Sequence, residues 1–60
     1  MRVLTIEELM LLTRFELTYL LARIKGVLAE LPDESEDREA ALTSLRNIRH
    51  VLLRRDLSPR

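Results

Sequence analysis

Residues 5–16 read TIEELMLLTRFE, and this stretch decides how the chain folds. It holds two complete capping boxes, Thr5 with Glu8 and Thr13 with Glu16. In each box the threonine hydroxyl accepts a hydrogen bond from the amide of the glutamate, and the glutamate carboxylate accepts one from the amide of the threonine. Two helix starts so close together predict a short helix over 5–12 and a second helix that begins at residue 14.

The ends of the two longer helices are marked as well. Pro32 cannot continue a helix, so the second helix is predicted over 14–31. An acidic stretch that ends in Ser35 caps a third helix, predicted over 35–55, and the arginines of its last turn suit the negative end of the helix dipole. Residues 58–60 are predicted to form a tail.

A continuous helix over 5–31 is the alternative. Apolar residues recur at alternating steps of three and four from Val3 to Leu31, as in a heptad seam, and Thr13 is the one polar residue in that series. On this alternative the chain is a two-helix hairpin. The polar interruption coincides with the second capping box, which favours a break at that point.

The composition indicates an all-α protein. Hydrophobic residues make up 47% and charged residues 33% of the chain, leucine is the commonest residue, and Phe15 and Tyr19 are the only aromatic residues. Good helix formers therefore predominate over strand formers. The 60 residues suffice for one small domain, 1–60. Because there is no cysteine, a disulfide framework, a cysteine zinc site and a thiol nucleophile are excluded.

Neither a secretory signal nor a membrane span is expected from the sequence. Glu7 and Glu8 interrupt the apolar residues near the start, and the longest apolar run is Leu9–Leu12. A membrane-spanning helix needs about 20 apolar residues. We therefore expect a cytoplasmic protein without membrane contact.

Each of the two long helices carries an apolar stripe, and antiparallel packing of the stripes predicts a helical-hairpin core. The short helix is expected to fold over the open end of this hairpin. The stripes consist of Leu17, Leu20, Leu21, Ile24, Val27, Leu28 and Leu31 in one helix, and of Ala41, Leu42, Leu45, Ile48 and Leu52 in the other.

The helix predicted over 14–31 has a second apolar face, opposite its stripe. This face consists of Phe15, Tyr19, Ala22, Gly26 and Ala29, with Leu11 and Leu12 adding apolar area near the aromatic end. A helix that is apolar on two faces is usually packed on both. Three interpretations stay open: the short helix covers the face, its aromatic residues stand singly exposed, or the face binds a second copy or another protein's helix.

Basic residues gather on one side of the third helix. Arg46, His50 and Arg54 follow one another at steps of four. An electropositive strip of this kind suits RNA, DNA or an acidic protein, and the alternative is a solvated face that complements the helix C-terminus. The ten basic and ten acidic residues cancel, which argues against a dedicated nucleic-acid binder.

No combination of side chains predicts catalysis. His50 is the only histidine, and its helical neighbours four residues away are arginines, so no metal pair or catalytic dyad is expected. The acidic residues at 33–39 lack the alternating ligands and central glycine of an EF-hand. We therefore expect no enzyme, no bound metal and no cofactor.

A pattern of short segments extends over most of the chain. The segments are Leu4-Thr5-x-x-Glu8-Leu9, Leu12-Thr13-Arg14-x-x-Leu17, Leu31-Pro32, Arg38, Ala41-Leu42 and Asn47-Ile48-Arg49-x-Val51-Leu52. The pattern resembles small alphaproteobacterial proteins of integrative conjugative elements, the quorum-sensing antiactivators of the TraM and QseM type. The resemblance implies a helical protein that binds a transcriptional activator and stops it working. In architecture alone, the predicted hairpin also resembles Rop, an RNA-binding hairpin that dimerises into a four-helix bundle.

Together these observations predict a small regulator that binds another protein. The residues expected to bind the partner are Leu11, Phe15, Tyr19, Ala22, Gly26, Arg46, His50 and Arg54. The aromatic side chains are expected to anchor the partner, the small residues to permit close approach of its helix, and the basic residues to select it by charge. The alternative is a Rop-like homodimer that binds RNA or DNA through the arginine strip.

Overall fold

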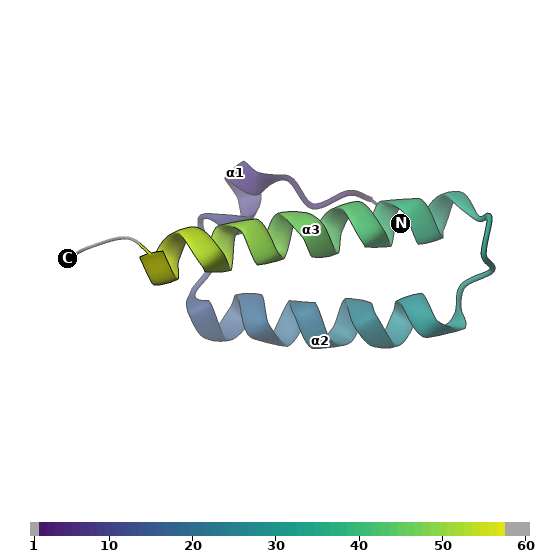
Figure 1. Ribbon diagram of the computed structural model, residues 1–60, viewed down its shortest axis with the longest axis horizontal. Coiled ribbons are helices and arrows are strands. Elements are labelled where there is room, and N and C mark those ends of the chain that lie inside the picture. Colours follow the sequence, from purple (N-terminus) through teal and green to yellow (C-terminus); the bar gives the residue numbers. More distant parts are fainter. Residues whose placement is uncertain (1, 58–60) are drawn as a thin grey trace.

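Three α-helices account for the regular structure of residues 2–57, the part of the chain that the computed structural model describes. They are α1 (Ile6–Leu9), α2 (Arg14–Glu30) and α3 (Glu36–Leu57). Figure 1 shows α2 and α3 side by side and antiparallel, with α1 next to α3 near the open end of the hairpin. The predicted all-α hairpin with a short N-terminal helix is confirmed. The tail predicted at 58–60 lies outside the described residues.

The helical conformation is interrupted between α1 and α2, so the alternative of one continuous helix over 5–31 is wrong. Both capping boxes form: the hydroxyl of Thr5 accepts from the amide of Glu8 at 3.2 Å, and that of Thr13 from the amide of Glu16 at 3.1 Å. α1 ends at Leu9, earlier than the predicted residue 12. The amides of Leu11 and Leu12, which follow α1, bond back three residues rather than four, which tightens the chain into a turn that leads to the second box.

The connection from α2 to α3 follows from its sequence. Leu31 is extended because it precedes a proline, so α2 ends at Glu30. The Ser35 hydroxyl accepts from the amide of Arg38 at 3.1 Å and caps α3. α3 continues to Leu57, two residues beyond the predicted end at 55.

Contacts with the start of the chain support this longer C-terminal end of α3. Arg55 donates to the carbonyl oxygen of Met10 at 3.0 Å, and Asp56 pairs with Arg14 at the start of α2. The C-terminal end of α3 is therefore tied both to the backbone after α1 and to the start of α2.

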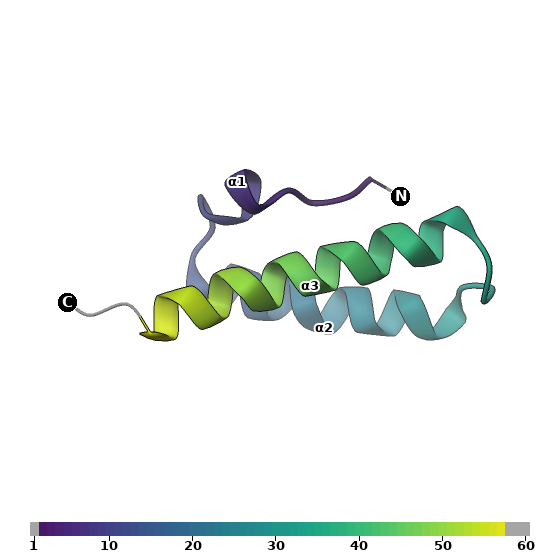
Figure 2. The same cartoon turned by 45° about the horizontal axis from the view of Figure 1, so that its top comes forward.

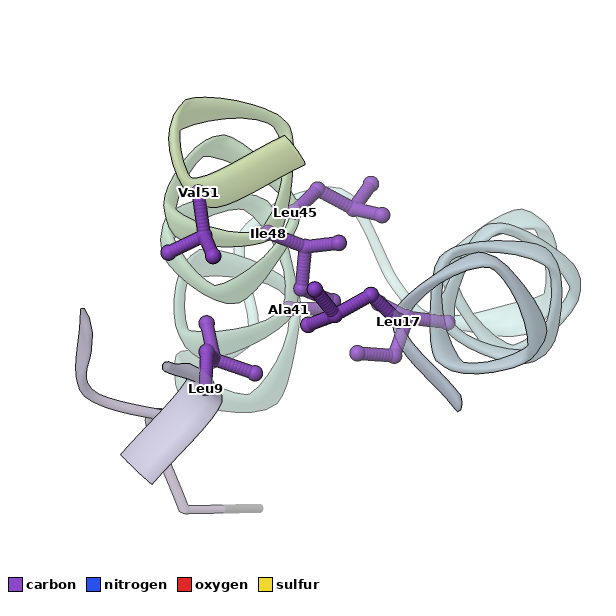
Figure 3. Packing of buried hydrophobic residues seen from close by; sticks show 7 residues of the cluster. Leu9, Leu17, Ala41, Leu45, Ile48 and Val51 are labelled. Carbon is purple, nitrogen blue, oxygen red and sulfur yellow. The ribbon is translucent and has the colours of Figure 1, made fainter. Parts of the chain in front are cut away.

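The core lies between α2 and α3 and continues under α1. Its buried apolar residues are Leu9, Leu17, Ile24, Ala41, Leu45, Ile48 and Val51, and Figure 3 shows how they pack. The prediction that Leu42 and Val27 belong to the core is wrong, because Leu42 is 46% exposed and Val27 is also exposed. In their place Val51 and Ser44 are buried, since α3 packs against α1 and the N-terminal segment as well as against α2.

Residues 2–4 form an extended segment that runs alongside α3 (Figure 2). The amide of Leu4 donates to the Ser44 hydroxyl at 3.0 Å, and its carbonyl oxygen accepts from the Asn47 side chain at 2.8 Å. α3 thus satisfies both backbone groups of one residue, which fixes the register of the segment.

An exposed ion pair ties this segment to α1. Arg2 donates to both carboxylate oxygens of Glu8 at 2.8 Å. The hydrogen bond from Arg2 and the one from the Thr5 amide lower the pKa of Glu8 to about 2. Because the carboxylate form is stabilised, its contribution to folding is complete above the ordinary glutamate range and is lost as the pH falls towards 2.

Candidate functional site

The second apolar face of α2 lies open to solvent. Phe15 is 90% exposed, Tyr19 61% and Leu11 86%, and the small residues Ala22 and Gly26 are exposed too. These five residues, four on α2 and Leu11 in the turn before it, we call the outer face, and they include both aromatic residues of the chain. Phe15 and Tyr19 line a shallow hollow with Leu12, Glu16 and Leu20.

α1 leaves the outer face uncovered, so the interpretation that the short helix packs on this face is wrong. α1 packs against α3, where Leu9 is buried near Val51 (Figure 3). The reason lies in the path after α1: the chain crosses α3 near its C-terminal end, where Arg55 donates to the carbonyl oxygen of Met10, before α2 begins (Figure 1). Leu17 and Ile24 then point at α3, which leaves residues on the opposite side of α2 in solvent.

Tyr19 is held in place on the outer face by Arg23. The Arg23 guanidinium donates to the Tyr19 hydroxyl at 3.1 Å, and its central carbon lies 5.8 Å from the centroid of the ring. The hydrogen bond to the tyrosine raises the pKa of Arg23. A ring fixed in this way loses less side-chain entropy when a partner covers it.

Gly26 has no role in packing within the chain. A β-carbon built at this position would meet no atom within 4 Å beyond the adjoining residues and the backbone of its own helix, and no described glycine has a positive φ angle. A glycine inside a helix is less stable than an alanine by about 0.5–1 kcal/mol. The position therefore lowers the stability of α2 without a benefit inside the fold.

We expect Gly26→Ala to stabilise the protein by about 0.5–1 kcal/mol, because the new methyl group meets open space and the unfolded chain loses freedom. For a domain of this size the midpoint of thermal unfolding should rise by about 2–8 °C. Circular dichroism at 222 nm during heating measures this change. A lower midpoint would mean that the backbone of α2 needs glycine here.

The basic residues occupy a different surface from the outer face. Arg46, His50 and Arg54 are all exposed on α3, whereas the outer face is the side of α2 turned away from α3. Arg54 also lies beside α1, where it lines a hollow with Ile6. The eight predicted partner-binding residues therefore form two separate surfaces, and a single helix cannot lie across both.

Sequence reasoning predicted Leu42 to be in the core, although it is exposed, and did not single out the exposed Leu53. Leu42 and Leu53 are exposed beside Arg46 and Arg49 on the same helix. Their spacing of four, seven and eleven residues from Leu42 places all four on one side of α3, and this spacing was the signal available in the sequence. Met10, after α1, is exposed as well.

No residue arrangement within the described part of the chain suggests bound metal. No group of three or more histidine, cysteine, aspartate or glutamate side chains is placed to hold a metal ion there. No helix formed by residues 2–57 is both long and apolar enough to cross a membrane. The outer face and the basic surface of α3 are thus the features of this fold that call for a functional explanation.

Comparison with known proteins adds no family to this description. No protein-family model matches the chain, and neither a curated protein nor a solved structure matches it.

Proposed function

We propose that the protein is a non-enzymatic regulator that binds another protein by packing the outer face of α2 against a helix of that partner. The observation that carries the proposal is the 90% exposure of Phe15. Exposed aromatic residues next to other apolar residues are typical of binding surfaces, and buried aromatic side chains dominate the binding energy of most interfaces.

The arrangement of the outer face favours a helix as the binding element. Phe15 and Tyr19 supply bulk at one end, and Ala22 and Gly26 leave a low strip at the other. A partner helix can approach the backbone of α2 closely along this strip, while the two aromatic rings pack against the side of that helix. Gly26 then has a use in the complex that it lacks in the free chain.

The resemblance to the antiactivators suggests the class of partner. We propose that the partner is a transcriptional activator and that binding sequesters it. Sequestration requires only a tight complex that hides a functional surface of the activator, so it suits a small chain with an apolar helix face and needs no catalysis.

The test replaces both aromatic residues and measures retention of the partner. The tagged protein is used to capture the partner from an extract of the cells that naturally produce the protein. The partner is then purified and titrated against each variant. Phe15→Ala combined with Tyr19→Ala should weaken binding by about 100-fold or more, because two anchoring side chains are lost. The circular dichroism spectrum of the variant should remain that of a helical protein, since both side chains are exposed.

Two further variants sharpen this test. Gly26→Leu should also abolish binding by filling the low strip, while the open space around Gly26 lets the fold persist. Leu42→Ala combined with Leu53→Ala removes comparable exposed area from α3 and should leave binding unchanged. Undiminished binding by the aromatic double variant would refute the proposal. If the captured protein is not a transcriptional activator, the antiactivator part of the proposal is wrong.

A further inference from the structure

The hairpin of α2 and α3 has two long edges, and the N-terminal segment closes one of them. Leu4 is bonded to α3 through Ser44 and Asn47. It also lines a hollow with Leu20 and Val27 of α2. These contacts place the segment over the groove between the two helices on that side.

Among residues 2–57, no segment covers the opposite edge in this way, as the residues that follow one another on α3 show. Consecutive residues of a helix point 100° apart. Val51 is buried and lines the hollow beside α1, Leu52 packs against the core, and Leu53 is 57% exposed on the far side. In the same way Ser44 faces the N-terminal segment, and Arg46, two residues later, is exposed.

On α2 the same geometry places Leu28 at the opposite edge, because it follows Val27 by one step. Arg38 of α3 donates to the carbonyl oxygen of Leu28 at 3.2 Å, so the two helices meet there. We call this side the open edge. It consists of Lys25 and Leu28 on α2 and of Leu42, Arg46, Arg49 and Leu53 on α3.

The open edge combines apolar and positive groups. Leu42 and Leu53 are exposed about 16 Å apart along α3, and Arg46 and Arg49 lie between them. Within residues 2–57 no ion pair involves these two arginines or Lys25. The nearby acid Asp56 is paired with Arg14. The edge therefore presents leucines together with basic side chains that take part in none of the ion pairs of residues 2–57.

We propose that the open edge binds an acidic amphipathic helix of another protein. A third helix laid in the groove of an antiparallel pair covers the leucines by ordinary helix packing and completes a three-helix bundle. Its carboxylates would meet Arg46, Arg49 and Lys25, which select it by charge. This edge is separate from the outer face of α2, so the inference is independent of the function proposed above.

Two other occupants fit the open edge less well. A second copy of the chain would present the same positive edge, and like charges facing each other oppose pairing. A nucleic acid would match the arginines, but it would leave the two leucines without an apolar partner, and the edge has no aromatic ring on which a base stacks.

The experiment uses two synthetic 18-residue helical peptides as probes. Both carry leucines at the same helical spacing, and the remaining positions are mostly glutamate in one peptide and mostly lysine in the other. Fluorescence anisotropy measures their binding to the full chain. The glutamate peptide should bind at least about 10-fold tighter than the lysine peptide. Arg46→Glu combined with Arg49→Glu should reverse this preference.

Control variants separate the edge from other surfaces. Arg54→Glu changes a charge on the same helix beside α1 and should leave the preference unchanged. Phe15→Ala with Tyr19→Ala should also leave it unchanged, so failure here and failure of the outer-face proposal are distinguishable. Leu42→Ala with Leu53→Ala should weaken binding of the glutamate peptide at least about fivefold. Each variant is first checked for helical circular dichroism.

Three outcomes would overturn the inference. The first is equal binding of the two peptides, or binding of neither. The second is a preference that survives the double charge reversal. The third is tighter binding of a 20-nucleotide single-stranded RNA or a DNA duplex than of the glutamate peptide, with loss of that binding in the charge-reversed variant. The third outcome would assign the open edge to nucleic acid.

Discussion

Leu17→Ala is expected to leave a large share of the molecules unfolded at 25 °C. Leu17 is fully buried between α2 and α3, and truncation of a buried leucine costs about 2–5 kcal/mol. The core of a domain this small rarely supplies more than about 3–5 kcal/mol of net stability. The loss is therefore comparable to the whole free energy of unfolding. The midpoint of thermal unfolding, followed at 222 nm, should fall by at least about 10 °C.

Leu53→Ala is the matched control for this prediction. It makes the same chemical change in a helix, but Leu53 is mostly exposed, so the expected loss is below about 1 kcal/mol. Urea titration of both variants gives the two free energies on one scale. Similar losses in the two variants would contradict the buried position of Leu17 and with it the packing of α2 on α3.

The helix starts could be predicted because they depend on neighbours in the sequence. The box of Thr13 and Glu16 satisfies amides within one turn, whatever the rest of the chain does. It therefore outweighed the heptad seam that favoured one long helix. The end of α1 was less predictable, because the turn between the two boxes has no glycine or proline to mark it.

The side of α3 that is buried could not be predicted from periodicity alone. An apolar stripe shows which residues are suited to burial, but α3 packs against partners on two sides. The N-terminal segment binds Ser44 and Asn47, and α1 covers Val51, so the buried sector is turned away from Leu42. This contact joins residues 40 and 43 positions apart in the sequence, and no local pattern indicates it.

The candidate site was predicted residue by residue on α2 but not as one surface. Phe15, Tyr19 and Gly26 share a helix face, and helical spacing alone establishes that. Whether α1 covers them depends on the path of the turn, which only the fold reveals. The distance between this face and Arg46 likewise depends on how α2 is rotated against α3.

Ser44→Ala is expected to release the N-terminal segment and α1 while the hairpin stays folded. Ser44 is fully buried, and its hydroxyl is the acceptor for the amide of Leu4. Without that acceptor the amide is left unsatisfied when the segment docks, which costs about 1–3 kcal/mol. Alanine is also the better helix former, so α3 itself gains slightly. The substitution should therefore destabilise the docking of the N-terminal segment and slightly stabilise α3.

Amide hydrogen exchange distinguishes this local release from global unfolding. The amides of Leu9 and Met10, which are bonded within and after α1, should exchange about 5- to 150-fold faster, as a loss of 1–3 kcal/mol predicts. Asn47→Ala should act in the same direction, because it removes the donor to the carbonyl oxygen of Leu4. Thr18→Ala removes a hydroxyl that bonds only within α2 and should not affect these amides. Equal acceleration of exchange throughout α3 would contradict this prediction. It would show that the N-terminal segment and the hairpin unfold together as one cooperative unit.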